Sequence, residues 1–341
     1  MTSPDTSPER PGPDTTGGAA ILVTGGAGYI GSHACKALAA AGFLPVAFDN
    51  LSTGHADAVR WGPLEQGDVA DASAVAAALE RHRAVAVMHF AASAYVGESV
   101  TRPWDYYANN VGGIIGLLQG CDRAGVRRVV FSSSCAVYGT PDRLPITEDC
   151  PRAPINPYGR TKAICEDILT DYAATGGWRH VALRYFNAAG ADPEGELGER
   201  HYPETHLIPL ALMAALGGRE SLDVFGTDYD TPDGTCLRDY IHVADLAEAH
   251  VLAVRYLLDG GESVALNLGT GHAISVAEVV ATVARVTGRS LRTIDRPRRP
   301  GDPAALVADP ARAARVLGFA ATRSDPDRMI ADAAPWFEGR N

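Results

Sequence analysis

The sequence predicts an α/β fold, in which a doubly wound parallel sheet is followed by a smaller mixed α/β lobe. Apolar, strand-like runs alternate with helical patterns up to about Phe186. A glycine-rich turn separates the first apolar run from the first helical pattern, and later runs end in small or hydroxyl residues. The chain has 341 residues, which is enough to bury a substantial core in two lobes.

The first apolar run, Ala20 to Val23, leads into Thr24-Gly25-Gly26-Ala27-Gly28-Tyr29-Ile30-Gly31. Gly25 permits a tight turn, Gly28 lets the backbone approach a pyrophosphate, and Gly31 lets the next helix pack on the strand. The amino end of that helix then faces the phosphates of a dinucleotide. This order of strand, turn and helix is typical of a Rossmann-type domain.

A second apolar strand is expected from Leu44 to Phe48, and it ends in Asp49. Asp49 follows the glycines by about 20 residues, where an acid holds the 2′-hydroxyl of the adenine ribose. Because the same carboxylate would repel a 2′-phosphate, the motif favours NAD over NADP.

Two more strands are expected, from Ala84 to Ala92 and from Arg128 to Ser134. The first ends in small residues and the second in hydroxyls. In an open parallel sheet the ligand crevice lies outside the carboxyl ends of the strands. Ser134 is therefore expected in that crevice, between a substrate hydroxyl and Tyr158.

The chain has only two lysines against 28 arginines, and one of them, Lys162, follows Tyr158 by four residues. A helix is expected here, because Asn156 is a good N-cap, Pro157 suits the first helical position, and the helical pattern continues through Leu169. On one face of a helix the ammonium lies beside the phenol and can lower its pKa. Such a tyrosine can take a proton from a sugar or alcohol hydroxyl as general base.

Together, the glycine turn, Asp49, Asp68, the Ser134 strand end and the Tyr158-x3-Lys162 pair resemble the extended short-chain dehydrogenase/reductase family. Within it, the chain from about residue 20 onward is similar to the UDP-glucose 4-epimerases. The segments that carry this likeness are Gly97-Glu98-Ser99-Val100, Tyr106-Tyr107-Ala108-Asn109-Asn110-Val111, Arg184-Tyr185-Phe186-Asn187, Arg238-Asp239-Tyr240-Ile241-His242 and Arg299-Pro300-Gly301-Asp302.

The resemblance implies an NAD that stays bound through turnover. Tyr158, assisted by Ser134, would remove the proton of the sugar 4-hydroxyl while the C4 hydride passes to the nicotinamide, and Lys162 would bridge the nicotinamide ribose. The 4-keto sugar nucleotide would then turn over and regain the hydride on its opposite face. The residues implied to contact NAD are Gly25, Gly28, Tyr29, Ile30, Gly31, Asp49, Asn50, Asp68, Val69, Phe90, Ala91, Ala92, Asn109, Ser134, Tyr158, Lys162, Tyr185 and Phe186.

The partner implied by the resemblance is a UDP-sugar. Arg238 and Arg299 match the family's diphosphate-binding arginines, whose planar forks recognise phosphate oxygens bidentately. The residues implied on the substrate side are Ser134, Tyr158, Asn187, His206, Leu207, Val224, Phe225, Arg238, Arg299, Asp302 and Leu306.

Three positions depart from the best-known bacterial pattern. Ala94 stands where many relatives have a lysine, and His206 stands where some have an asparagine. Leu306 replaces a tyrosine that closes the sugar pocket in hexose-only members. We therefore expect a sugar pocket that is partly open to an N-acetyl group.

Other functions remain open from the sequence. The segments 90–99 and 233–238 also resemble 4-epimerases that act on UDP-xylose and UDP-arabinose. A sugar-nucleotide dehydratase usually has an acidic pair beside its active serine or threonine, whereas Cys135 and Ala136 follow Ser134 here. A non-catalytic NAD-binding protein shares the fold, but such proteins usually lose the tyrosine or the lysine, and this chain has both.

Three parts are expected along the chain: a disordered tail at 1–18, an NAD-binding Rossmann domain at 19–186, and a nucleotide-sugar-binding lobe at 187–341. The segment from Val264 to Leu268 is expected to return to the main sheet. Two late helices have start signals, namely a capping box of Ser275 and Glu278, and Asp309 as a cap before Pro310.

Composition indicates the surroundings of the protein. No segment has the apolar core of a secretory signal or the length of a membrane span, and the formal charge of −11 speaks against nucleic acid as a partner. Six cysteines without Cys-x2-Cys spacing indicate a reduced, cytoplasmic protein. Ten histidines show no His-x3-His spacing, so no metal is expected. The resemblance implies a homodimer packed through helices of the cofactor domain, the Tyr158 helix among them.

Overall fold

The computed structural model describes residues 18–299 and 302–338. The expected tail, residues 1–18, lies outside these ranges except for Gly18, and so do Pro300 and Gly301 of the Arg299 motif.

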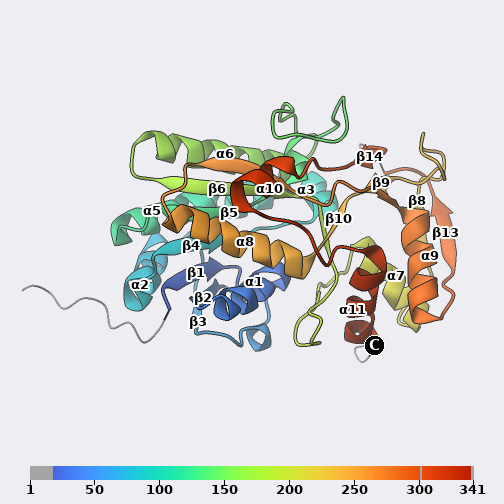
Figure 1. Cartoon of the computed structure of the whole chain (residues 1–341), viewed down its shortest axis with the longest axis horizontal. Coiled ribbons are helices and arrows are strands. Elements are labelled where there is room, and N and C mark those ends of the chain that lie inside the picture. Colours follow the sequence, from blue (N-terminus) through green and yellow to red (C-terminus); the bar gives the residue numbers. More distant parts are fainter. Residues whose placement is uncertain (1–17, 300–301, 339–341) are drawn as a thin grey trace, which may run out of the picture.

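A seven-stranded parallel sheet forms the centre of the molecule (Figure 1). From one edge to the other its strands are β11 (Val264–Leu268), β6 (Arg179–Tyr185), β5 (Arg128–Ser134), β4 (Ala86–His89), β1 (Ala20–Thr24), β2 (Leu44–Asp49) and β3 (Leu64–Gln66). The strand order reverses between β1 and β4, which places a crevice at the carboxyl ends of these strands. The predicted doubly wound parallel sheet is confirmed.

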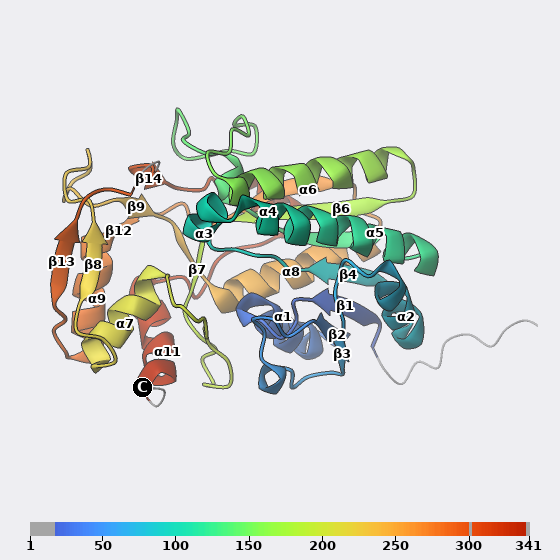
Figure 2. The same cartoon turned by 180° about the vertical axis from the view of Figure 1, so that it is seen from behind.

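Helices cover both faces of this sheet, as Figures 1 and 2 show from opposite sides. One face carries α1 (Tyr29–Ala40), α8 (Val243–Leu258) and α10 (Ala311–Leu317), and the other carries α2 (Ala72–His82), α5 (Gly113–Ala124) and α6 (Pro157–Ala174). Because both faces are covered, the inner strands are almost fully apolar and buried. Shorter turns of helix lie at the crevice end: η1 (Ala56–Ala58), α3 (Val96–Thr101), α4 (Pro103–Tyr106), η2 (Tyr107–Gly112) and η3 (Cys135–Val137).

A second lobe, at the right of Figure 1, has its own apolar core around Leu212, Val283 and Ile330. Its helices are α7 (Leu207–Leu216), α9 (Val276–Thr287) and α11 (Pro326–Glu338). Small sheets accompany them: β8 (Leu222–Phe225) with β13 (Thr293–Arg296), β9 (Leu237–Arg238) between β12 (Ile274–Ser275) and β14 (Ala305–Leu306), and β7 (Asn187–Ala189) with β10 (Tyr240–His242). Residues after 187 thus supply both this lobe and the elements α8 and β11 of the main sheet layer.

Some predicted boundaries hold and others move. Helix α6 begins at Pro157 after the Asn156 cap, and the capping box of Ser275 and Glu278 starts α9. The prediction of Asp309 as N-cap is wrong by one residue, because Pro310 is the cap and α10 begins at Ala311. Asp309 still serves the helix start, since its side chain accepts a hydrogen bond from Ala311 N at 2.9 Å.

The strand expected from Ala84 to Ala92 is shorter and ends at His89. Beyond it the chain passes over the glycine turn, where a Cβ on Gly25 would lie 2.6 Å from Ala91 N. In the part of the chain that the structure describes, no helix combines the length and the apolar character needed to cross a membrane.

Candidate active site

The glycine turn between β1 and α1 lies at the point where the strand order reverses. Gly25 has φ of 71°, in the left-handed region that favours glycine, and its N donates to Phe48 O at 2.9 Å. Gly28 is the N-cap of α1 and brings no side chain over the first amides of the helix. These amides and the positive end of the helix dipole fit the pyrophosphate of a dinucleotide.

Gly31 has a slightly different role from the expected one. A Cβ on Gly31 would lie 2.1 Å from Gly25 O and 3.0 Å from Gly26 Cα. The missing side chain therefore lets α1 approach the glycine turn as well as the strand before it, with which it shares an apolar cluster.

The acidic residues predicted around the adenosine gather at the ends of β2 and β3. The buried Asp49 carboxylate accepts hydrogen bonds from Ala27 N at 3.0 Å and Leu51 N at 2.8 Å, so it is fixed against the glycine turn. Asn50 Nδ2 donates to Asp68 Oδ2 at 3.1 Å, and the buried Val69 follows. This set fits an adenine ribose, with carboxylates but no described cation placed for a 2′-phosphate.

The floor of the crevice next to β4 carries Phe90 and Asn109. Phe90 lies against His250 with ring centroids 4.6 Å apart. Asn109 belongs to η2, a π-helix, and its Nδ2 donates to Ser93 Oγ at 3.2 Å. The neighbouring Asn110 donates to Thr161 Oγ1 at 3.0 Å, which ties this π-helix to α6.

Ser134, Tyr158 and Lys162 meet where β5 ends and α6 begins. Asn156 accepts from Gly159 N at 2.8 Å and so sets the start of α6. A Cβ on Gly159 would lie 2.4 Å from Ala136 O, so only glycine lets α6 approach the end of β5 this closely. Lys162 Nζ donates to Ser132 O at 2.7 Å and lies 5.9 Å from the centroid of the Tyr158 ring.

The pKa of Tyr158 depends on its burial and on its neighbours. Burial raises the pKa of this phenol above its usual value, and a hydrogen bond with the Ser134 hydroxyl acts in the opposite direction. The ammonium is turned towards Ser132 O, and burial lowers the pKa of Lys162 to about 8. Ser134 is thus an assisting neighbour of the phenol, and the expectation that Lys162 lowers the Tyr158 pKa stays a prediction.

Tyr185 and Phe186 follow on the neighbouring strand. Tyr185 is paired with Ser134 across β5 and β6, and its hydroxyl shares a 2.5 Å hydrogen bond with Ser132 Oγ. Phe186 packs in one apolar cluster with Cys135, and Leu306 packs against that cluster. The position that sequence reasoning linked to the sugar pocket thus lies close to the carboxyl end of β5.

The predicted diphosphate arginines lie in the second lobe. Arg238 is buried, pairs with Asp302, and stands opposite Leu306 in the pairing of β9 with β14. The Arg299 guanidinium lies 4.1 Å from the centroid of the Phe225 ring, which shares β8 with Val224. Sequence reasoning placed Asp302 near Arg238 but missed that the two form an ion pair.

Asn187, Leu207 and His206 occupy other edges of the crevice. Asn187 Nδ2 donates to Asp239 O at 3.0 Å, which fixes β7 beside β10. His206 is the N-cap of α7, directly before Leu207, and its Nδ1 lies 2.5 Å from Glu199 Oε1. The roles of these residues towards a substrate stay predictions.

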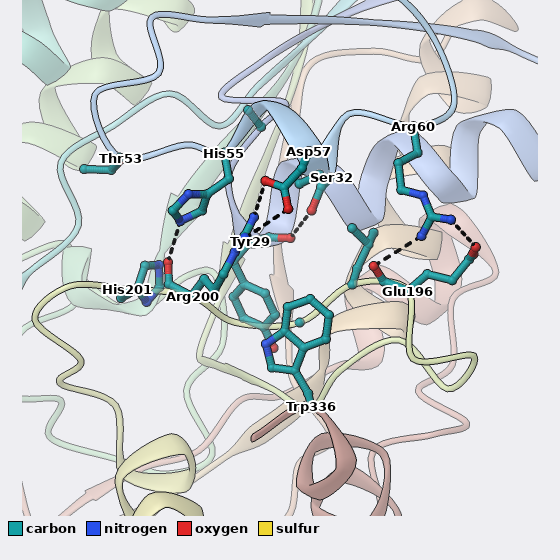
Figure 3. A pocket seen from close by; sticks show the side chains of 15 residues that line it. Tyr29, Ser32, Thr53, His55, Asp57, Arg60, Glu196, Arg200, His201 and Trp336 are labelled. Carbon is teal, nitrogen blue, oxygen red and sulfur yellow. Dashed lines mark hydrogen bonds and ion pairs between the residues drawn. The ribbon is translucent and has the colours of Figure 1, made fainter. Parts of the chain in front are cut away.

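A pocket beside the start of α1 was not predicted (Figure 3). It lies between Tyr29 on α1 and the segment 196–201, and Trp336 closes one side. The segment is fastened on both sides of the pocket, by Arg200 to Asp57 and by Glu196 to Arg60. The remaining lining residues are Ala27, Gly28, Ser32, Thr53, His55, Ala58, Leu197, Gly198 and His201.

Comparisons with known proteins place this geometry among relatives. A model of the NAD dependent epimerase/dehydratase family matches residues 21–269. A UDP-glucose 4-epimerase of Rhizobium meliloti (strain 1021) is 55% identical over 321 residues, which cover 94% of this chain and 98% of that protein.

Two solved structures agree with this likeness. The crystal structure of UDP-glucose 4-epimerase from Brucella ovis in complex with NAD superposes with a TM-score of 0.92 at 58% identity, and the match covers 94% of this chain and 98% of that one. UDP-glucose-4-epimerase from Stenotrophomonas maltophila, with bound NAD and formylated UDP-arabinopyranose, also gives 0.92, at 41% identity and the same coverage.

Proposed function

The chain belongs to the NAD dependent epimerase/dehydratase family, and we propose that it interconverts UDP-glucose and UDP-galactose by inverting C4 of the hexose. The observation that carries the proposal is the meeting of Ser134, Tyr158 and Lys162 at the carboxyl end of β5, in a chain 55% identical to a UDP-glucose 4-epimerase.

In this reaction NAD, once bound, supplies a hydride acceptor that later gives the hydride back to the same carbon. The glycine turn, Asp49 and Asp68 would hold its pyrophosphate and adenosine, and Lys162 its nicotinamide ribose. Tyr158 in its phenolate form would accept the proton of the sugar 4-hydroxyl through Ser134, and the resulting phenol would return that proton when C4 regains the hydride. A 4-keto sugar nucleotide results, and its return with inverted configuration requires the sugar to rotate.

Arg238 and Arg299 would hold the diphosphate while the sugar turns. The Arg238 guanidinium is pre-oriented by Asp302, so little side-chain entropy is lost when it meets the phosphate oxygens. Because the diphosphate anchor lies in the second lobe and the Tyr158 phenol in the first, the hexose between them can swing without release of the nucleotide.

The experiment is an assay of the purified full chain without added cofactor, against UDP-glucose, UDP-galactose, UDP-N-acetylglucosamine and UDP-xylose. Turnover of the first two, with NAD identified after denaturation, is expected.

Tyr158→Phe should lower kcat by about a hundredfold or more, because general-base assistance is lost. Tyr172→Phe on the same helix is the matched control and should keep kcat. Full activity in Tyr158→Phe would contradict the role proposed for this tyrosine. A preference of the natural chain for UDP-xylose would contradict the proposed substrates.

We also propose that the protein forms a homodimer and acts in the cytoplasm. Helices α3, α4 and α5 are neighbours in Figure 2, and four large apolar side chains on them are exposed: Val96, Val100, Trp104 and Ile115. Such a group of exposed apolar residues favours a protein interface.

All six cysteines are free and buried, which supports a reducing compartment.

A further inference from the structure

Four potential metal ligands converge in the segment between β7 and α7, namely Glu199, His201, Glu204 and His206. One ligand atom from each lies within 4.8 Å of all the others. His201 Nδ1 is 3.0 Å from Glu199 Oε1 and 3.7 Å from Glu204 Oε2. His206 Nδ1 is 2.5 Å from Glu199 Oε1 and 3.3 Å from Glu204 Oε1.

The four groups lie close enough together for a small coordination tetrahedron: two of the separations, 3.3 and 3.7 Å, are near its edges, whereas the contacts at 2.5 and 3.0 Å are hydrogen-bond distances that a bound ion would widen. Zinc bonds to histidine nitrogen and carboxylate oxygen are about 2.0–2.2 Å long, so ligand atoms around a tetrahedral ion lie about 3.3–3.5 Å apart. Two imidazole nitrogens and two carboxylates form a donor set suited to zinc and its first-row neighbours. We infer that Glu199, His201, Glu204 and His206 bind one zinc-class divalent ion.

The two histidines of the cluster differ in their contacts, because His206 Nδ1 pairs closely with Glu199 at 2.5 Å. His201 Nδ1 is buried and has no hydrogen-bond partner among the described residues, although Glu199 Oε1 is only 3.0 Å away. An ion bound between the four residues would give His201 Nδ1 a partner and take the place of the direct His206–Glu199 contact.

Neighbouring groups hold the ligands in place, as around many metal sites. Glu204 Oε1 accepts hydrogen bonds from Thr205 N at 2.7 Å and His206 N at 2.8 Å, so the carboxylate is oriented before an ion arrives. The buried Glu199 is fixed through its carbonyl, which accepts from Trp336 Nε1 at 2.9 Å. The Tyr95 ring stands at the edge of both imidazoles, 5.7 Å and 6.5 Å between centroids.

A second group of carboxylates in the same segment provides a contrast. Asp192, Glu194 and Glu196 also converge, but the Lys36 ammonium sits among them at 2.7, 2.7 and 2.9 Å. This set already holds a cation and has no place for another. The set around His201 has converging ligands and no lysine or arginine among the described ion pairs of its members.

The proposed ion has a structural role, because four protein ligands leave no open position for a substrate. It ties the segment that closes the pocket beside Tyr29 to the N-cap of α7 and thereby fixes the position of Leu207. This inference does not depend on the reaction that the protein catalyses.

The test uses the full chain freed of metal by a chelator and then titrated with Zn²⁺ by calorimetry and with Co²⁺ by visible absorption. We expect one ion per chain, the intense visible bands of four-coordinate Co²⁺, and a higher Tm with Zn²⁺. His201→Gln and Glu204→Gln should each weaken binding at least about tenfold. Glu194→Gln, which changes the carboxylate set around Lys36, is the matched control and should bind as the natural chain does.

Circular dichroism of each variant verifies that it is folded. The wild-type titration decides the matter even if a ligand variant does not fold. No saturable Zn²⁺ or Co²⁺ binding by the natural chain would mean that these residues form only a network of protonated histidines and carboxylates, and it would overturn the inference. Equal affinity in the control and in a folded His201→Gln, Glu204→Gln double variant would overturn it as well.

Discussion

The two lysines of the chain occupy opposite environments. Lys36 binds three carboxylates at the surface of α1, whereas Lys162 is buried beside Phe131 and Tyr158 and donates to one carbonyl. Without an acidic partner in direct contact, burial lowers the Lys162 pKa to about 8. The ammonium is therefore present at neutral pH and is lost as the pH rises through this value.

This pKa predicts a pH dependence of catalysis. If the Lys162 ammonium assists the reaction, kcat should fall as the pH rises above about 8. Lys162→Arg keeps a charge at all accessible pH values, so its profile, at a lower kcat, should lack that descending limb. The measurement is kcat from pH 6 to pH 10, and Lys36→Arg is the control that should retain the limb. If kcat of Lys162→Arg still falls above about pH 8, the group that titrates is not Lys162.

Leu306 predicts the width of the sugar pocket. Its side chain packs against the cluster that contains Phe186 and Cys135, next to Ser134. We expect measurable turnover of UDP-N-acetylglucosamine by the natural chain, and Leu306→Tyr should reduce it by about tenfold or more while UDP-glucose turnover changes less. The exposed Leu144→Tyr is the control. If Leu306→Tyr lowers the turnover of both substrates equally, Leu306 does not select between them.

At this scale the sequence was most informative where function depends on local spacing. Tyr158 and Lys162 are one helical turn apart, so their proximity follows from the helix alone. The proposed metal ligands have a sequence pattern, Glu-x-His-x2-Glu-x-His from Glu199 to His206, which differs from the His-x3-His spacing of a helical metal site. The four residues lie in a non-helical segment, whose path depends on tertiary contacts.

Helix α6 is held to the sheet by a buried ion pair. Glu166, one turn after Lys162, receives two hydrogen bonds from Arg184 on β6, at 2.9 Å and 2.6 Å, and one from Ser133 at 2.5 Å. The Arg184 guanidinium also donates to Tyr138 at 2.8 Å. This network fixes the helix that carries Tyr158 relative to the strand that carries Ser134.

Removing one partner should be costly. Glu166→Ala leaves the Arg184 charge buried without its carboxylate, and we expect the free energy of unfolding to fall by about 3–5 kcal/mol. The control is Glu262→Ala, because the pair of Glu262 with Arg179 is exposed and should be worth at most about 1 kcal/mol. Urea unfolding at pH 7.5 measures both, and similar losses in the two variants would contradict this view of the buried pair.

Among the elements, α6 was predictable and η2 was not. The Asn156 cap and Pro157 are local signals that act within one turn. The π-helix Tyr107–Gly112 lies between α4 and α5 with no sequence signal that sets it apart from them, and the hydrogen bonds of Asn110 with the Ser93 backbone and with Thr161 support it. Only the folded chain brings those partners together.

For the whole molecule, buried histidines predict a loss of stability in acid. Burial lowers the pKa of His33, His180 and His250 to about 4 and that of His89 to about 3. Between these values and the usual 6.5 the unfolded chain binds more protons than the folded one, so stability falls as the pH drops below about 6.5.

At pH 5 the loss should be roughly 2 kcal/mol for each buried histidine. The urea midpoint should therefore be lower at pH 5 than at pH 7.5, and His250→Gln should reduce the difference. The exposed His272→Gln is the control and should leave the difference unchanged. Identical midpoints at the two pH values would contradict this account.

The proposed homodimer is tested at the same scale. Trp104 is 64% exposed and Ile115 is 41% exposed on neighbouring helices (Figure 2). A Trp104→Glu, Ile115→Glu double variant places two charges on these helices, and light scattering should find a monomer where the natural chain gives a dimer. Leu144→Glu, another exposed apolar position, should remain a dimer. If the natural chain is itself a monomer in solution, the proposed homodimer is wrong.

The order in which the chain supplies its parts matters while it is being synthesised. Strand β6 gains its outer neighbour β11 only after the elements β7 to β10, α7 and α8 have been made, and Leu306, opposite Arg238, comes later still. A nascent chain that has left the ribosome only up to β6 exposes an unpaired edge strand. Such partial products therefore lack both a finished sheet and the later residues Arg238 and Leu306, and these parts are completed near the end of translation.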